Sequence, residues 1–201
     1  NDGLPSQYTQ AQIDHYRTGD PVYYPNTDWI KELVKSSAPA TRANISASGG
    51  NKVAQYFASV GYLMNEGIYA HTNHGDYSTN IKLGGINFRS NLDVKLTNDW
   101  KLSVDMYGRI NNENAPYAST SDIWNSLYKY SSLIPMYVKD NRILGGTATF
   151  PLNPMALINE QGYRNISNRY LISNLSTQYD FGKLIKGLVA GVRFGYDNYY
   201  T

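Results

Sequence analysis

The feature that most constrains the fold is an alternation of apolar and polar residues that recurs along the chain. In a β-strand, successive side chains point to opposite faces, so a period of two predicts one apolar and one polar face. The pattern predicts six strands, over about 42–48, 54–64, 80–96, 100–112, 165–181 and 188–196. It is clearest where one face holds Ile86, Phe88, Leu92, Val94 and Leu96, and the other holds Asn87, Arg89, Asn91, Asp93 and Lys95.

The lengths of the strands and of their connections narrow the fold class. Two of the predicted strands, 80–96 and 100–112, are longer than the roughly 5–6 residues usual in globular sheets. Short links at 49–51, 97–99 and 182–186 alternate with long links at 24–41, 66–79 and 112–164. Short turns at one rim and long loops at the other are typical of outer-membrane barrels. We therefore predict an all-β chain: about six consecutive strands of a transmembrane antiparallel up-and-down β-barrel, with long extracellular loops.

Composition excludes several other classes of protein. The mean hydropathy is −0.49. The sequence contains no run of roughly 18 apolar residues, which excludes a membrane-spanning helix. A barrel passes this test because only alternate residues meet lipid. The absence of Cys excludes disulfides and thiolate metal sites. A net charge of +2 with mixed signs gives no reason to expect a nucleic-acid partner. The 19 Tyr residues suit membrane-interface belts or ligand-binding surfaces.

The pattern divides the chain into four segments. Residues 1–41 form an early barrel or extracellular loop region, with a short helix predicted over 9–16 and Thr9 as its N-cap. Residues 42–111 are barrel strands joined by short periplasmic turns. Residues 112–164 form a long extracellular loop in which a short helix begins at 121–125 and later prolines, among them Pro154, break the chain. Residues 165–201 return to barrel strands.

The residues give little support for catalysis. All three histidines, His15, His71 and His74, fall in predicted extracellular loop regions (His15 in the region 1–41) without a neighbouring nucleophile. A polar loop tip explains His71, His74 and Asp76 better than a metal site does. Carboxylates and arginines on the polar faces are expected to pair along a wet lumen. We therefore predict no enzyme activity, no catalytic residue, no cofactor and no metal.

Aromatic residues in the loops are the candidates for binding a substrate or a partner. They could stack on sugar rings or pack against a partner protein, and the alternative is that they pack the loops against one another. They are Tyr23, Tyr24, Trp29, Tyr117, Trp124 and Tyr128.

Several segments, taken in order, resemble one family, the SusC/RagA-type TonB-dependent transporters of Bacteroidetes outer membranes. The resemblance covers residues 8–100 best and continues more loosely through the last strands. Single motifs are common elsewhere, whereas the ordered set is specific. It consists of Tyr8-Thr9-Gln10, Tyr24-Pro25-Asn26-Thr27-Asp28-Trp29, Asn44-Ile45-Ser46-Ala47-Ser48-Gly49-Gly50, Val60-Gly61-Tyr62-Leu63, Glu66-Gly67-Ile68, Asn91-Leu92-Asp93 and Trp100-Lys101-Leu102.

The resemblance implies an outer-membrane location and the import of large nutrients, either glycan oligosaccharides or peptides. It also implies a SusD-like surface lipoprotein as partner, TonB with ExbB and ExbD as the energy source, and outer-membrane lipids around the barrel. Members of the family carry a plug and a TonB box upstream of the barrel, and neither is found in these residues, so we expect this chain to be part of a longer protein. The alternative that the residues leave open is a secreted carbohydrate-binding β-sandwich.

Overall fold

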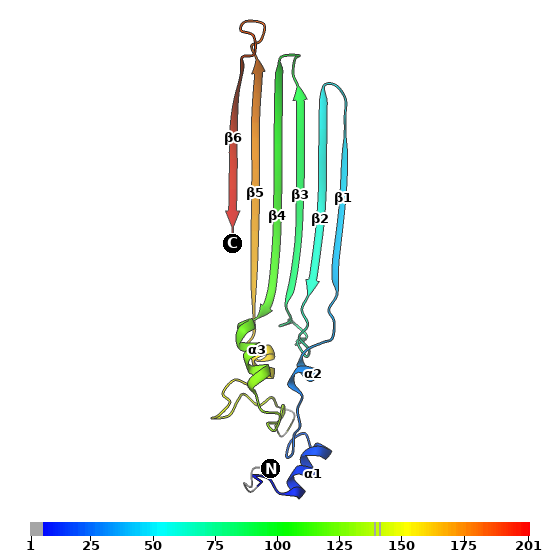
Figure 1. Ribbon diagram of the computed structural model, residues 1–201, viewed down its shortest axis with the longest axis vertical. Helices are drawn as coiled ribbons and strands as arrows, with labels where there is room; N and C mark the ends of the chain where they lie inside the picture. Colours follow the sequence, from blue (N-terminus) through cyan, green and yellow to red (C-terminus); the bar gives the residue numbers. More distant parts are fainter. Residues whose placement is uncertain (1–5, 139, 141) are drawn as a thin grey trace. The chain divides into compact units, whose positions relative to one another are not determined.

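The computed structural model describes residues 6–138, 140 and 142–201. Six strands form one sheet, in which each strand lies beside its neighbours in sequence (Figure 1). This up-and-down order agrees with the order predicted from the alternation. The strands are β1 (Ala40–Gly50), β2 (Ala54–Glu66), β3 (Lys82–Lys95), β4 (Trp100–Pro116), β5 (Tyr163–Asp180) and β6 (Val189–Tyr200).

The register of the sheet places apolar residues beside apolar residues, and polar residues beside polar residues, on neighbouring strands. Ile45 of β1 pairs with Val60 of β2, and Val60 pairs with Phe88 of β3. One residue along, Ser46 pairs with Ser59, which has Arg89 as its partner on the other side. Because opposed residues project to the same face of a sheet, the alternation in the sequence becomes one apolar and one polar face across these strands.

The strand ends differ from the predicted ends by a few residues. The fourth strand continues to Pro116, and Gly49 and Gly50 belong to β1 rather than to the link that follows it. That link is three residues long because Asn51 caps it: its Oδ1 accepts hydrogen bonds from the backbone N–H groups of Val53 at 2.8 Å and Ala54 at 2.9 Å. A turn residue that organises its own backbone fixes the register of the hairpin.

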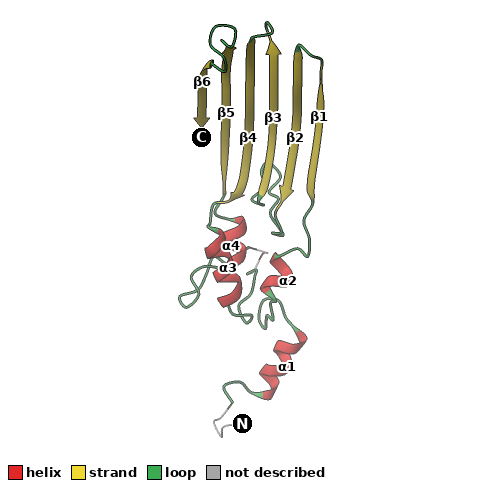
Figure 2. Ribbon diagram, turned by 45° about the horizontal axis from the view of Figure 1, so that its top comes forward, coloured by secondary structure: helices red, strands yellow, loops and turns green. Residues whose placement is uncertain are grey.

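Among the described residues, four α-helices lie outside the sheet (Figure 2). The first predicted helix is confirmed as α1 (Gln10–Thr18), with Thr9 and Gln12 forming a capping box. The second is confirmed as α3 (Thr120–Lys129), with Ser119 as its N-cap. Two further short helices, α2 (Trp29–Leu33) and α4 (Pro154–Asn159), were not predicted. No helix in the described ranges is long and apolar enough to cross a membrane.

The interpretation of Pro154 as a break in the chain was wrong. Pro154 opens α4, where its missing N–H removes no helical hydrogen bond. Asn153 caps the helix, since its Oδ1 accepts a hydrogen bond of 2.8 Å from the N–H of Met155. All six residues of α4 are buried.

The described residues group into two compact units. The sheet unit comprises residues Pro39–Glu66, Lys82–Glu113 and Asn165–Thr201, and the loop unit comprises 6–38, Gly67–Ile81 and Asn114–Arg164. The loop unit combines parts of all three long connections. It also contains every buried hydrophobic side chain in the described part of the chain. Its core consists of Trp29, Leu33, Tyr69, Ala118, Ile123, Leu127, Tyr130, Met136, Met155, Leu157 and Ile158.

Hydrogen bonds join the three segments of the loop unit. The indole Nε1 of Trp29 donates to the carbonyl oxygen of Ser131 at 3.1 Å. The N–H of Ala70 donates to the carbonyl oxygen of Leu33 at 2.9 Å. The Thr79 hydroxyl lies 3.4 Å from the side-chain oxygen of Asn159 in α4. Because buried backbone and side-chain polar groups require partners, these bonds allow irregular segments to enclose an apolar core.

In the sheet unit, Phe88 occupies the space left by a glycine on the neighbouring strand. A Cβ atom at Gly108 would lie 2.0 Å from Phe88 Cε1. We therefore expect Gly108→Ala to displace the ring and lower the stability of the protein by about 1–3 kcal/mol, as overpacking does. Gly84→Ala is the matched control, because no heavy atom lies within 4 Å of its added Cβ. The shift in unfolding midpoint of the two variants measures the effect, and equal shifts would contradict it.

Candidate functional site

The sheet unit has a broad apolar surface and no buried apolar core. Many large hydrophobic side chains of one face are exposed, among them Met106 at 38% and Ile45 at 78%. Soluble monomers rarely expose contiguous apolar surface on this scale, whereas a sheet that faces lipid must. The exposed set on this face includes Ile45, Val60, Tyr62, Ile86, Phe88, Leu92, Met106, Ile110, Leu175, Val192, Phe194 and Tyr196.

The opposite face carries a network of polar side chains. The amide Nδ2 of Asn91 donates to Asp105 Oδ1 at 2.5 Å. Asp93 accepts a hydrogen bond from the Ser103 hydroxyl and forms an ion pair with Lys101 at 3.2 Å. Polar groups joined across neighbouring strands suit the wall of a water-filled lumen.

The partners in this network differ from the expected pairing of carboxylates with arginines. Asp93 pairs with Lys101 rather than with an arginine. Arg89 instead lies over the ring of Tyr107, with its guanidinium carbon 5.8 Å from the ring centre. Such cation–π contacts are expected where an arginine meets an exposed aromatic face.

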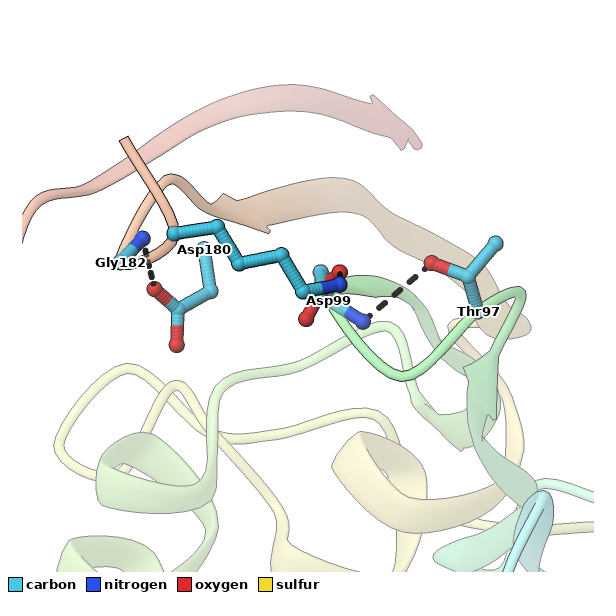
Figure 3. Close-up of polar contacts among 5 residues, drawn as sticks. Thr97, Asp99, Asp180 and Gly182 are labelled. Atoms are coloured by element: carbon cyan, nitrogen blue, oxygen red, sulfur yellow. Dashed lines mark hydrogen bonds and ion pairs between the residues drawn. The ribbon is translucent and has the colours of Figure 1, made fainter. Parts of the chain in front are cut away.

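Hydrogen bonds and an ion pair join two of the short turns (Figure 3). The Nζ of Lys183 contacts the Asp99 carboxylate, and this hydrogen bond raises the pKa of Lys183 above its ordinary value. The N–H of Asp180 donates to the carbonyl oxygen of Asp99 at 2.8 Å. Each turn is also braced internally: the N–H of Gly182 donates to Asp180 at 2.7 Å, and that of Asp99 to Thr97 at 3.2 Å.

Five of the six aromatic residues predicted to bind remain at least partly exposed. Tyr23, Tyr117 and Tyr128 are 79%, 69% and 70% exposed. Trp124 is half-buried and stacks on Tyr128 with ring centres 5.8 Å apart. Tyr24 is also half-buried, against His15 at 4.7 Å. The structure therefore brings Trp124 and Tyr128 together as one pair on α3.

Trp29 is placed differently from the other five. It is 3% exposed, and its ring meets that of Tyr130 edge-on at 5.1 Å. This placement matches the alternative considered for the loop aromatics, in which they pack the loops against each other.

The structure adds an aromatic ladder that the sequence did not reveal. Tyr77 stacks on His74 at 4.9 Å and on Tyr163 at 5.3 Å. No local pattern could have found it, because Tyr163 comes from a distant part of the chain. The ladder also gives His74 a ring partner, and the described residues contain no group of three His, Cys, Asp or Glu side chains placed to hold a metal ion.

A groove of about 340 Å³ runs beside α3 in the loop unit. Its apolar wall includes Tyr130 and Phe150, whose ring centres are 5.5 Å apart. Asp122 and Lys129 supply one negative and one positive charge among its lining residues. Burial raises the pKa of the Tyr130 hydroxyl, which is buried without a hydrogen-bond partner among the described residues, so this group stays neutral.

A search of curated proteins found a relative of the chain. The chain is 30% identical over 161 residues to a TonB-dependent receptor of Formosa agariphila, in a match that covers 73% of this chain and 14% of that protein. No protein-family model matches the chain.

Solved structures share its fold. A structure of the RagAB peptide transporter matches with a TM-score of 0.63 at 18% identity, over 95% of this chain and 23% of that one. The RagAB peptide importer in its closed-closed state matches with a TM-score of 0.61 at 21% identity, over 89% of this chain and 20% of that one.

A two-faced sheet of this topology is part of the wall of an outer-membrane β-barrel. The chain belongs to the TonB-dependent receptors, and its fold is that of the SusC/RagA type. It spans about a seventh of the length of its curated relative. The relatives are named as a receptor and as importers, which is consistent with a protein that is not an enzyme.

Proposed function

We propose that the receptor containing this chain imports large nutrients, peptides or oligosaccharides, across the outer membrane, and that this chain forms part of the wall of its barrel. The observation that carries the proposal is the two-faced sheet unit without a buried apolar core. Such a sheet is stable only when lipid covers its apolar face and when further strands complete its hydrogen bonds. The wall then contributes enclosure and a polar lumen, and it makes or breaks no covalent bond.

The loop unit supplies the surface for contact with cargo and partners. Its packed core holds three connections in one defined arrangement, so the side chains on its surface keep fixed positions. Half-buried Trp124 and exposed Tyr128, which stack on each other, offer flat rings for stacking on a sugar or on a peptide side chain. The groove with Asp122 and Lys129 suits a cargo that carries both charges and apolar groups, as a peptide does.

We further propose that the partners are those of SusC-like transporters. A SusD-like lipoprotein would close the barrel by contacting exposed loop residues such as Tyr117. TonB with ExbB and ExbD would supply the energy through a plug and a TonB box. The names of the RagAB structures suggest peptides as cargo by analogy. The stacked aromatic rings suit oligosaccharides equally well, so we propose both classes of cargo.

The rival β-sandwich requires a second sheet packed on the first. The strands in the described residues form a single six-stranded sheet with its apolar side chains exposed, which gives that rival no support.

Uptake in cells that carry the full-length receptor tests the function. We expect uptake of labelled peptides or oligosaccharides to require both the receptor gene and TonB. Trp124→Ala combined with Tyr128→Ala is expected to reduce uptake several-fold, because both rings of the stacking surface are lost. Because half-buried Trp124 also packs against the core of the loop unit, Tyr128→Ala alone, which removes only a 70% exposed ring, should lower uptake in the same direction. Tyr8→Ala, an exposed tyrosine outside the six binding candidates, is the control and should leave uptake unchanged. Uptake that persists without TonB, or without the receptor, would refute the proposal.

A further inference from the structure

An apolar groove lies on the sheet unit at the rim that carries the short turns. It has a volume of about 400 Å³ and is lined by Trp100, Tyr179, Phe181, Ala190 and Val192, together with residues 177 and 191. Its lining is mostly apolar, and the Thr177 hydroxyl accepts a 2.6 Å hydrogen bond from Trp100 Nε1. That bond satisfies the indole N–H and leaves the ring faces available for apolar contact.

The turn between β5 and β6 adjoins this groove through Phe181. The N–H of Phe181 donates to the carbonyl oxygen of Leu188 at 2.8 Å, and its own carbonyl accepts from Leu184 and Ile185 at 2.7 and 2.9 Å. These bonds make the turn compact, yet Leu184 is 81% exposed and Ile185 is 57% exposed. Large aliphatic side chains at the tip of an ordered turn indicate contact with an apolar medium.

The corresponding region beside the first short link is different. The hollow there is lined by polar and charged residues that include Asn51, Lys52, Gln55 and Lys95. An apolar groove is therefore a local property of the β5–β6 end of the rim.

Two lysines flank the aliphatic tip of the turn. Lys183 is held by Asp99. Lys186 is exposed and has no ion pair among the residues that the structure describes, so its charge is available to an outside partner. An apolar groove beside an unpaired cation matches a molecule with an acyl chain and a phosphate.

We propose that this groove and turn bind one anionic phospholipid of the membrane leaflet at that rim. The acyl chain lies against Trp100, Tyr179 and Phe181, and Lys186 contacts the phosphate. Leu184 and Ile185 anchor the turn in the interfacial region, where aromatic and cationic side chains commonly hold a barrel. The inference rests on the proposed function only in placing the sheet in a membrane.

Photo-crosslinking with lipid tests the site. The full-length receptor is placed in phosphatidylethanolamine nanodiscs that contain phosphatidylglycerol with a photoactivatable group on its acyl chain, and labelled peptides are mapped by mass spectrometry. We expect labelling to concentrate on residues 177–192 and on Trp100. Lys186→Gln should lower it about five-fold, the effect of one lysine on an anionic lipid. Leu184→Ser should also lower it, because the anchor becomes polar.

The control is Lys52→Gln, an exposed lysine in the polar link between β1 and β2, which should leave labelling unchanged. Equal labelling along all six strands, or equal effects of the two lysine variants, would overturn the proposal. The proposal would also be overturned if another part of the receptor covered residues 182–188 and kept them from being labelled. Because the assay contains no nutrient and no TonB, it can succeed when uptake fails, and it can fail when uptake succeeds.

Discussion

Trp29→Ala is expected to unfold the loop unit while the strands of the sheet unit remain paired. The substitution removes the indole from a core in which it is 3% exposed, leaves a cavity beside Tyr130, and deprives the Ser131 carbonyl of its donor. Truncating a buried tryptophan costs about 3–5 kcal/mol. Local opening of the loop unit should therefore become about two to four orders of magnitude more frequent.

Hydrogen exchange on the full-length receptor measures this effect segment by segment. Amides in Asn114–Arg164 and Gly67–Ile81 should lose protection in Trp29→Ala, although both segments lie far from residue 29 in sequence. Ile30→Ala is the matched control, because the neighbouring side chain on the same helix is 40% exposed and should change stability by less than about 0.5 kcal/mol. If exchange rose only around residue 29, the loops would not share one core.

Val60→Arg is expected to destabilise the receptor in lipid by about 2–4 kcal/mol, the cost of arginine near the middle of the bilayer. Val60 is 54% exposed, lies midway along β2, and has apolar partners, Ile45 and Phe88, on both neighbouring strands. The expected result is a lower unfolding midpoint and a lower yield of folded protein in phospholipid vesicles.

Ser46→Arg provides the control at the same level of the sheet. Ser46 follows Ile45 on β1, so its side chain projects to the opposite, polar face. There the arginine can remain hydrated, and we expect a change near zero. Comparable losses in the two variants would show that the face assignment is wrong.

The sheet was predictable because its information is local. A period of two specifies which residues share a face without any knowledge of distant partners, and the capping residue Thr9 likewise marked α1. The resemblance to SusC/RagA-type transporters supplied the family, which the alternation alone did not.

The loop unit was only partly predictable because its information is distant. Leu33, Tyr69 and Ile158 meet in one core from three connections, and no spacing along the chain encodes that meeting. Asn153 followed by Pro154 was a readable signal for the start of α4, but the proline was interpreted only as a breaker. Trp29 was grouped with the other loop aromatics although it is buried, because the residues that bury it come from distant parts of the chain.

The joining of three connections in one core also affects how much conformational entropy is lost when the long loops become ordered. A free connection as long as 117–162 loses much conformational entropy when its interior is fixed. The pairing of β2 with β3 and the neighbouring positions of β4 and β5 in the sheet already hold the two ends of the connections 67–81 and 117–162 near one another, so part of the loop-closure entropy is lost with the sheet. Once the strands have paired, segments that are distant in sequence start close together in space. Contacts such as that between Trp29 and Ser131 then form with a smaller further loss of entropy. The loop core should therefore assemble after the strands, and its sequence can diverge among receptors while the pairing that brings it together is kept.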